Sequence, residues 1–90
     1  MTDYPPIRYT AGFIKALAKL PQKAQDDFEK AVIFFRADPN DSRLHTKKLK
    51  GDLAGCYSIR INRDYRALFQ LGGRRSVEFF FIAHRKDIYR

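Results

Sequence analysis

The chain has little of several residue types on which many proteins depend. Of its 90 residues only Cys56 is a cysteine, and none is a tryptophan. A single cysteine excludes an internal disulfide bond, so we expect a protein of the reducing cytoplasm. No apolar run approaches the roughly 18 residues of a membrane span, and the first residues lack the pattern of a signal peptide. We therefore expect a soluble protein with no membrane partner.

Residues for metal and nucleotide chemistry are equally scarce. His45, His84 and Cys56 are too few for a plausible zinc site, and no group of carboxylates suits magnesium. The sequence also has no glycine-rich nucleotide-binding loop. Glu78 and Asp87 are the only carboxylates near the last predicted strand, a poor supply for a hydrolase that uses a carboxylate pair. We expect neither a metal nor any other cofactor.

Positive charge is what the chain has in excess. Its 18 lysines and arginines oppose 10 aspartates and glutamates, which gives a formal net charge of +8. Such a field favours a polyanionic partner, such as nucleic acid, a ribosome, an acidic protein or an anionic membrane surface. The simpler interpretation is a basic surface that only keeps the protein soluble.

The spacing of apolar residues predicts one α+β domain over residues 1–90. A short strand over 7–10 precedes two helices, one over 11–20 and one from Pro21 to about Ala37, with Thr10 as the first cap. The pattern then alternates with period two over three predicted strands, 56–61, 65–71 and 76–83. This order predicts a short N-terminal strand, a helical hairpin and a three- to four-stranded, mainly antiparallel sheet covered on one face.

Strand alternation predicts where the cations lie on this sheet. If Ile59 and Phe69 face the helices, Arg60 and Arg66 project from the uncovered face. The last strand is expected to bring three further candidates to the same end of the sheet, namely His84, Arg85 and Tyr89. The basic stretch before the first strand of the meander contains Lys47, Lys48 and Lys50. Exposed arginines on a sheet also serve simply to protect it from aggregation, so each residue alone is a weak signal.

A cationic groove without a metal can bind a phosphodiester, and it can also cleave RNA. The 2′-hydroxyl of RNA is then the nucleophile, and the protein positions it, stabilises the transition state and moves two protons. Arginine stays charged and therefore stabilises charge rather than moving protons. Tyrosine has an ordinary pKa of about 10, so Tyr89 would need cationic neighbours to act as a base. Arg85, Lys86 and Arg90 are such neighbours.

The segment KKLKGDLAGCYSIRINRDYRALF, residues 47–69, is followed by a strand that ends in HRKDIYR. These motifs, and the predicted order of elements over nearly the whole chain, resemble the RelE/ParE superfamily, the toxins of type II toxin–antitoxin systems. RelE-type members cut mRNA on the ribosome, whereas ParE-type members poison DNA gyrase on a similar fold. The resemblance implies a RelE-like fold and a cognate antitoxin that wraps and neutralises the chain. On the favoured RelE branch, it also implies the ribosome and mRNA as partners.

The resemblance also implies roles for individual residues. Arg60 would stabilise developing charge, Arg66 would contact the scissile phosphate with Arg85 in the same cluster, and Tyr89 would orient the substrate nucleotide. His84 stands where RelE has a lysine, which makes His84 a candidate general base beside Tyr89, and the sequence leaves both open. Contacts to RNA or the ribosome are expected from Lys47, Lys48, Lys50, Arg63 and Lys86. The chain is expected to lack the C-terminal helix that some relatives carry.

Two other functions stay open at this stage. One is a ParE-like toxin that inhibits DNA gyrase by protein binding, and the other is a basic nucleic-acid-binding domain without catalysis. Arg66, Arg85 and Tyr89 favour the endoribonuclease, because gyrase binding does not require that chemical set.

Overall fold

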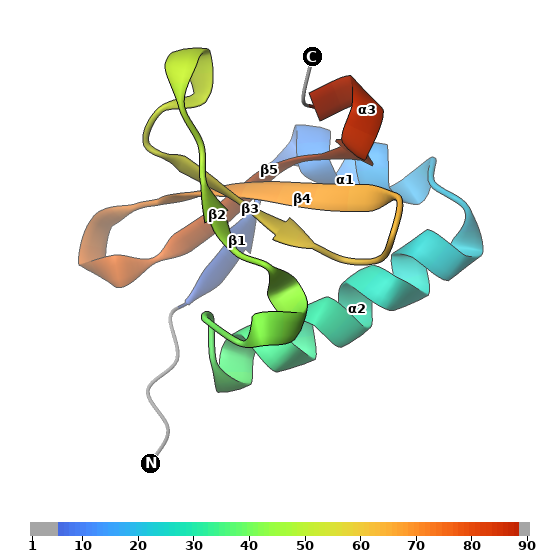
Figure 1. Ribbon diagram of the computed structural model, residues 1–90, viewed down its shortest axis with the longest axis horizontal. Helices are drawn as coiled ribbons and strands as arrows, with labels where there is room; N and C mark the ends of the chain where they lie inside the picture. Colours follow the sequence, from blue (N-terminus) through green and yellow to red (C-terminus); the bar gives the residue numbers. More distant parts are fainter. Residues whose placement is uncertain (1–5, 89–90) are drawn as a thin grey trace.

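The computed structural model describes residues 6–88 as one five-stranded sheet with helices packed on it (Figure 1). In chain order the elements are β1 (Ile7–Tyr9), α1 (Ala11–Ala18), α2 (Gln22–Ala37), the 3₁₀ turn η1 (Ser42–Leu44), β2 (Lys47–Lys48), the 3₁₀ turn η2 (Gly51–Leu53), β3 (Cys56–Arg60), β4 (Tyr65–Leu71), the 3₁₀ turn η3 (Gly73–Arg75), β5 (Val77–His84) and α3 (Arg85–Ile88). The predicted α+β class, with its helical hairpin and antiparallel meander, is confirmed.

The strands follow the order β1-β5-β4-β3-β2 across the sheet. Neighbours from β2 to β5 pair antiparallel and form the predicted meander. The N-terminal strand β1 joins the same sheet by pairing parallel to β5, with Ile7 opposite Val77. This pairing adds a fifth strand and makes β5 an interior strand.

The helical hairpin follows from local signals in the sequence. The Thr10 side-chain oxygen accepts a hydrogen bond from the Phe13 N–H at 3.0 Å, which caps α1 as predicted. Helix α1 ends at Ala18, two residues before the predicted end, because Leu20 precedes Pro21 and is disfavoured in a helical conformation. The Gln25 side-chain amide donates to the Leu20 carbonyl at 3.0 Å, so α2 satisfies an acceptor left at the end of α1.

Phenylalanine rings from both helices and from the sheet form the core. Phe13 of α1 and Phe28 of α2 pack against Phe79 of β5, with ring centroids 5.7 and 5.5 Å from the Phe79 centroid. Phe35 of α2 contacts Phe69 of β4 at 5.2 Å. All five rings are buried, which confirms the predicted apolar faces of both helices. In Figure 1 the long helix α2 lies below the sheet, whereas α3 and the yellow-green turn η2 lie above it.

The C-terminal part differs from the prediction in two ways. A β-bulge between Leu68 and Phe69 interrupts the pairing of β4 with β5, so the alternation expected along the last strand fails at Phe80. A helical turn, α3, also follows β5 directly, although no C-terminal helix was expected. Both features change which side chains lie above the sheet.

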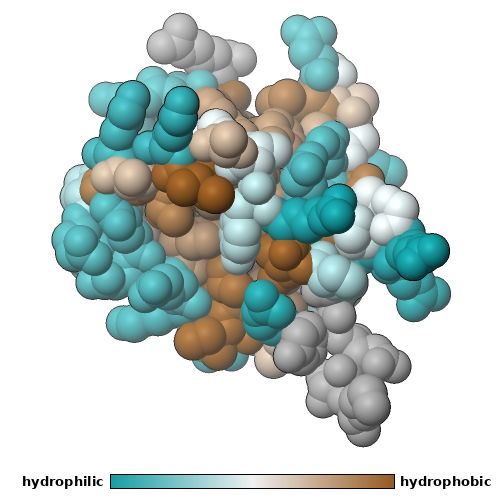
Figure 2. Space-filling view, turned by 180° about the vertical axis from the view of Figure 1, so that it is seen from behind, coloured by the Kyte–Doolittle hydropathy of each residue, from teal (hydrophilic) through white to brown (hydrophobic). Residues whose placement is uncertain are grey.

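The surface mixes charged and apolar side chains. Figure 2 shows brown apolar patches separated by teal hydrophilic side chains on the rear of the molecule. Large apolar side chains with substantial exposure are Tyr9, Ile14, Ile33, Leu71 and Phe81. No helix between residues 6 and 88 has both the length and the apolar character that a membrane span needs.

Candidate functional site: a cationic pocket on the open face of the sheet

Two arginines face each other across β3 and β4. Arg60 and Arg66 are register partners, and the next pair along, Ile59 and Ala67, is fully buried in the core beneath the helices. Because side chains alternate along a strand, the two arginines emerge on the opposite face. This agrees with the face predicted from the sequence.

A histidine and a lysine complete a pocket around this pair. Among the described residues, a hollow of about 120 Å³ is lined by His45, Lys47, Arg60 and Arg66. Lys47 reaches it from the edge strand β2, where it lies opposite Ser58. His45 ends η1 in a left-handed conformation with φ 46°, which histidine adopts more readily than most residues. We call this hollow the cationic pocket.

The turn between β3 and β4 holds both arginines in place. Arg60 Nε donates to the Asn62 carbonyl oxygen at 3.3 Å, and one Arg66 guanidinium nitrogen donates to the same oxygen at 2.8 Å. Arg66 also donates to the Tyr65 carbonyl oxygen at 3.0 Å. Like charges directly opposite each other on a sheet are destabilising. An anion bound between the two guanidinium groups would remove that repulsion.

Asn62 connects this turn to helix α2. Its side-chain oxygen accepts from the Asp64 and Tyr65 N–H groups at 2.8 and 2.9 Å, and its amide nitrogen donates to the Asp27 carboxylate at 2.9 Å. That hydrogen bond is the main reason that the pKa of the Asp27 carboxyl lies below its ordinary value. Desolvation opposes this shift, and the nearby Lys23 adds to it. The turn that orients the arginines is therefore fixed to the helical layer.

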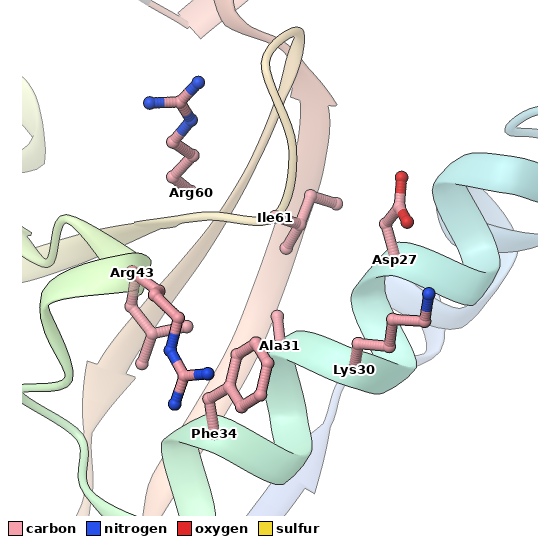
Figure 3. A pocket seen from close by; sticks show the side chains of 8 residues that line it. Asp27, Lys30, Ala31, Phe34, Arg43, Arg60 and Ile61 are labelled. Atoms are coloured by element: carbon pink, nitrogen blue, oxygen red, sulfur yellow. The ribbon is translucent and has the colours of Figure 1, made fainter.

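Arg60 also borders a second hollow, between α2 and the strands (Figure 3). In Figure 3 the guanidinium groups of Arg60 and Arg43 point in opposite directions. Arg43 lies over the Phe34 ring at 3.7 Å and forms an ion pair with Asp41 at 2.7 Å. The hydrogen bonds from Arg43 lower the pKa of Asp41 to about 2. Arg43 is thus engaged by its own neighbours, and Arg60 is the cation that the two hollows share.

The strand register does not bring His84 beside the arginine pair. Arg66 lies opposite Ala83, whereas His84 lies opposite Tyr65, one position further along. The His84 ring packs edge-on against the Tyr65 ring, with centroids 5.5 Å apart, and Tyr65 packs against the core cluster. His84 Nδ1 accepts a weak hydrogen bond from the Lys86 N–H at 3.3 Å. By strand alternation the imidazole therefore lies on the face opposite to Arg66, and its catalytic role stays a prediction.

Apart from Lys47, the other predicted site residues that the structure describes are not in the lining of the cationic pocket. Arg85 begins α3, and its N–H donates to the Asp64 carbonyl at 2.7 Å, which ties α3 to the β3–β4 turn. The side chains predicted to contact RNA or the ribosome are all exposed, namely Lys47, Lys48, Lys50, Arg63 and Lys86. Tyr89 lies outside the described residues.

Solved structures share this architecture. YafQ from Escherichia coli is similar over 96% of this chain and 99% of that chain, with a TM-score of 0.75 and 15% identity. A YoeB/ParE toxin from Agrobacterium tumefaciens is similar over 88% and 96%, with a TM-score of 0.72 and 17% identity. The toxin–antitoxin complex RelBE2 from Mycobacterium tuberculosis contains a chain similar over 92% and 100%, with a TM-score of 0.64 and 26% identity.

The chain has the fold of the RelE/ParE superfamily. The resemblance seen in its motifs is therefore confirmed by the structural comparison. No family model matches the sequence, and no curated protein does. The RelE/ParE fold is thus evident in the structure although neither of these two comparisons finds a match.

On this RelE/ParE fold, His45 is the pocket residue that the sequence did not single out. The available signal was its position two residues before Lys47, at the entrance to the basic stretch. That signal becomes meaningful only with the pairing of β2 and β3, which sets Lys47 and thereby His45 beside Arg60. Within residues 6–88, no three side chains of the metal-ligating types lie close enough to hold a metal ion.

Proposed function

We propose that the chain is the toxin of a type II toxin–antitoxin system and that it cuts mRNA on the ribosome as a metal-independent endoribonuclease. The observation that supports this most directly is the cationic pocket, in which Arg60, Arg66, Lys47 and His45 converge on one small hollow. The RelE/ParE fold and the 26% identity to a chain of a toxin–antitoxin complex support the toxin role.

In the proposed reaction the pocket holds the scissile phosphate. The substrate 2′-oxygen attacks phosphorus, the new oxygen–phosphorus bond forms, and the bond to the 5′-oxygen of the next nucleotide breaks. The products are a 2′,3′-cyclic phosphate and a 5′-hydroxyl. Arg60 and Arg66 donate hydrogen bonds to the phosphate oxygens, on which negative charge grows in the transition state. Both guanidinium groups donate a hydrogen bond to the Asn62 carbonyl oxygen, which fixes their orientation before the substrate binds.

His45 is the residue that we assign to proton transfer. In general, imidazole gains and loses protons near neutral pH, whereas guanidinium and ammonium groups do not. His45 would take the proton from the 2′-hydroxyl as the bond to phosphorus forms. The leaving 5′-oxygen takes a proton from a general acid, a role that we assign to Tyr89.

An acidic antitoxin is the partner that suits this surface. The net charge of +8 would accelerate its capture, because complementary fields raise association rates. An antitoxin segment that places a carboxylate in the cationic pocket would block the phosphate site directly.

The test is primer extension on mRNA from a reconstituted translation reaction. Wild-type protein should produce new 5′ ends within codons, and Arg66→Ala should lower the cleavage rate by about 100-fold or more, as expected when a donor to a developing oxyanion is removed. His45→Gln should also slow cleavage strongly. Lys15→Ala removes the same charge from the exposed end of α1 and is expected to cut like wild type.

Two results would overturn the proposal. Intact mRNA together with inhibition of DNA gyrase would favour the ParE-like function. RNA binding without cleavage, unchanged in Arg66→Ala, would favour a nucleic-acid-binding domain without catalysis.

A further inference from the structure

The β-bulge in β5 turns two consecutive phenylalanines toward the open face of the sheet. Leu68 of β4 pairs with Phe81 and Phe69 pairs with Phe79, so Phe80 between them has no partner in the register. Phe79 is fully buried in the core beneath the helices. Phe80 and Phe81 both line a hollow on the other side, which a regularly alternating strand would not allow.

This hollow lies between η2 and α3. Its volume is about 300 Å³, and its lining is Leu53, Leu68, Phe80, Phe81, Asp87 and Ile88. Leu68 forms a buried floor, whereas the Phe81 side chain is 41% exposed. We call this hollow the aromatic pocket. Its lining is apolar except for one carboxylate, so it suits a flat or apolar group.

The aromatic pocket lies beside the cationic pocket on the same face of the sheet. Arg66 and Leu68 are two residues apart on β4, and their partners Ala83 and Phe81 are two residues apart on β5. Same-face residues on a strand are about 6.8 Å apart. One ligand that carries an anionic group and an apolar ring can therefore reach both pockets at once.

We infer that the aromatic pocket receives an unstacked RNA base whose neighbouring phosphate lies between Arg60 and Arg66. This inference rests on the proposed function, and it names the RNA base as the part of the substrate that binds in the aromatic pocket. Proteins read single-stranded RNA by stacking splayed-out bases on aromatic rings beside cationic groups, which is the arrangement of these two pockets. The volume lies at the lower end of the range for small-ligand sites and suits one base.

A photocrosslink tests the contact directly. An mRNA with 5-iodouridine placed in turn at each position of the ribosomal decoding site, and with a 2′-methoxy group that prevents cleavage, is bound with the wild-type protein and irradiated. Stacked aromatic rings react preferentially with this base, so mass spectrometry should locate the crosslink at Phe80 or Phe81 for one register. A crosslink confined to other residues would overturn the inference.

Substitution at Phe81 tests how much its aromatic ring contributes to mRNA binding. Phe81→Leu keeps an apolar side chain but removes the ring, and it should weaken mRNA binding by about 10-fold or more, the loss expected for one stacked base. Phe81→Tyr should restore binding, and Ile33→Ala, which trims an exposed apolar residue of α2, should not change it. Unchanged thermal melting of Phe81→Leu would show that the fold is retained.

The outcomes separate the two proposals. If the wild-type protein does not cleave mRNA, the proposed function is wrong. If it cleaves and Phe81→Leu cleaves equally well, only the base site is wrong. If Phe81→Leu loses affinity for the antitoxin while cleavage is unchanged, the aromatic pocket holds a protein side chain and the inference is also wrong.

Discussion

Replacing Asn62 by alanine should lower both stability and activity, because one side chain holds the β3–β4 turn, helix α2 and, through the turn, the arginine pair. The substitution removes three hydrogen bonds, two from backbone N–H groups and one to the Asp27 carboxylate. A hydrogen bond contributes about 0.5–1.5 kcal/mol, and the turn is half-exposed, so we expect a loss of about 2 kcal/mol. For a domain of this size that loss lowers Tm by about 10 °C.

The assay is thermal unfolding followed by circular dichroism at about pH 7. Asn40→Ala provides the control, because Asn40 is an exposed asparagine in the turn after α2, where a substitution should change stability by less than about 0.5 kcal/mol. mRNA cleavage should fall in Asn62→Ala even well below its melting temperature, since the carbonyl that both guanidinium groups share is no longer fixed. If Asn62→Ala had the same Tm as the wild type, the role of Asn62 as the connection between turn and helix would be refuted.

The stabilisation that the hydrogen bond between Asn62 and the Asp27 carboxylate provides should decrease at low pH. Its pKa is lower in the folded protein than its ordinary value, so this stabilisation is complete above the ordinary pKa and is lost as the pH falls through the folded pKa. The difference in stability between wild type and Asn62→Ala should therefore shrink between about pH 7 and about pH 3. Asn62→Asp keeps the acceptor for the turn but sets a second carboxylate against Asp27. It should be more destabilised at about pH 7 than at about pH 3, and the opposite order would contradict the assigned hydrogen bond.

Three further substitutions test the fold. Thr10→Ala removes the cap of α1 and should cost about 1 kcal/mol, measured as a lower midpoint in urea unfolding. Phe79→Ala empties the centre of the core and should cost about 3–5 kcal/mol, so the chain should be largely unfolded in a proton NMR spectrum; a well-dispersed spectrum would contradict its central position. Arg74 has φ 57° in the β4–β5 turn, so Arg74→Gly should raise stability by about 0.5–1 kcal/mol, and a lower Tm would argue against strain there.

The sequence predicted those helices and strands that are long enough to show a periodic spacing of apolar residues. The helical hairpin and the strands β3 and β4 were located within two residues, because apolar residues repeat at helical or alternating spacing over their whole length. The face of Arg60 and Arg66 followed from the same alternation. These are local patterns that tertiary packing then reinforces.

The remainder of the site depends on pairing that no local pattern specifies. Strand β2 is only Lys47–Lys48, too short to show a period, and it is this strand that brings His45 beside Arg60. The bulge at Phe80 shifts the alternation by one residue, which a run of three phenylalanines conceals. His84 was expected in the groove because it is near the right end of the last strand, but the register assigns that place to Ala83.

The pairing of β1 with β5 has a consequence for how the protein is made. Ile7 pairs with Val77, so the sheet can close only after two segments far apart in the chain have both been synthesised. Bringing such distant segments together is entropically slow, and it completes the core around Phe79 only after β5 has emerged. Arg66 lies on β4, the strand next to β5, so the cationic pocket that it lines is complete only when β5 has joined the sheet.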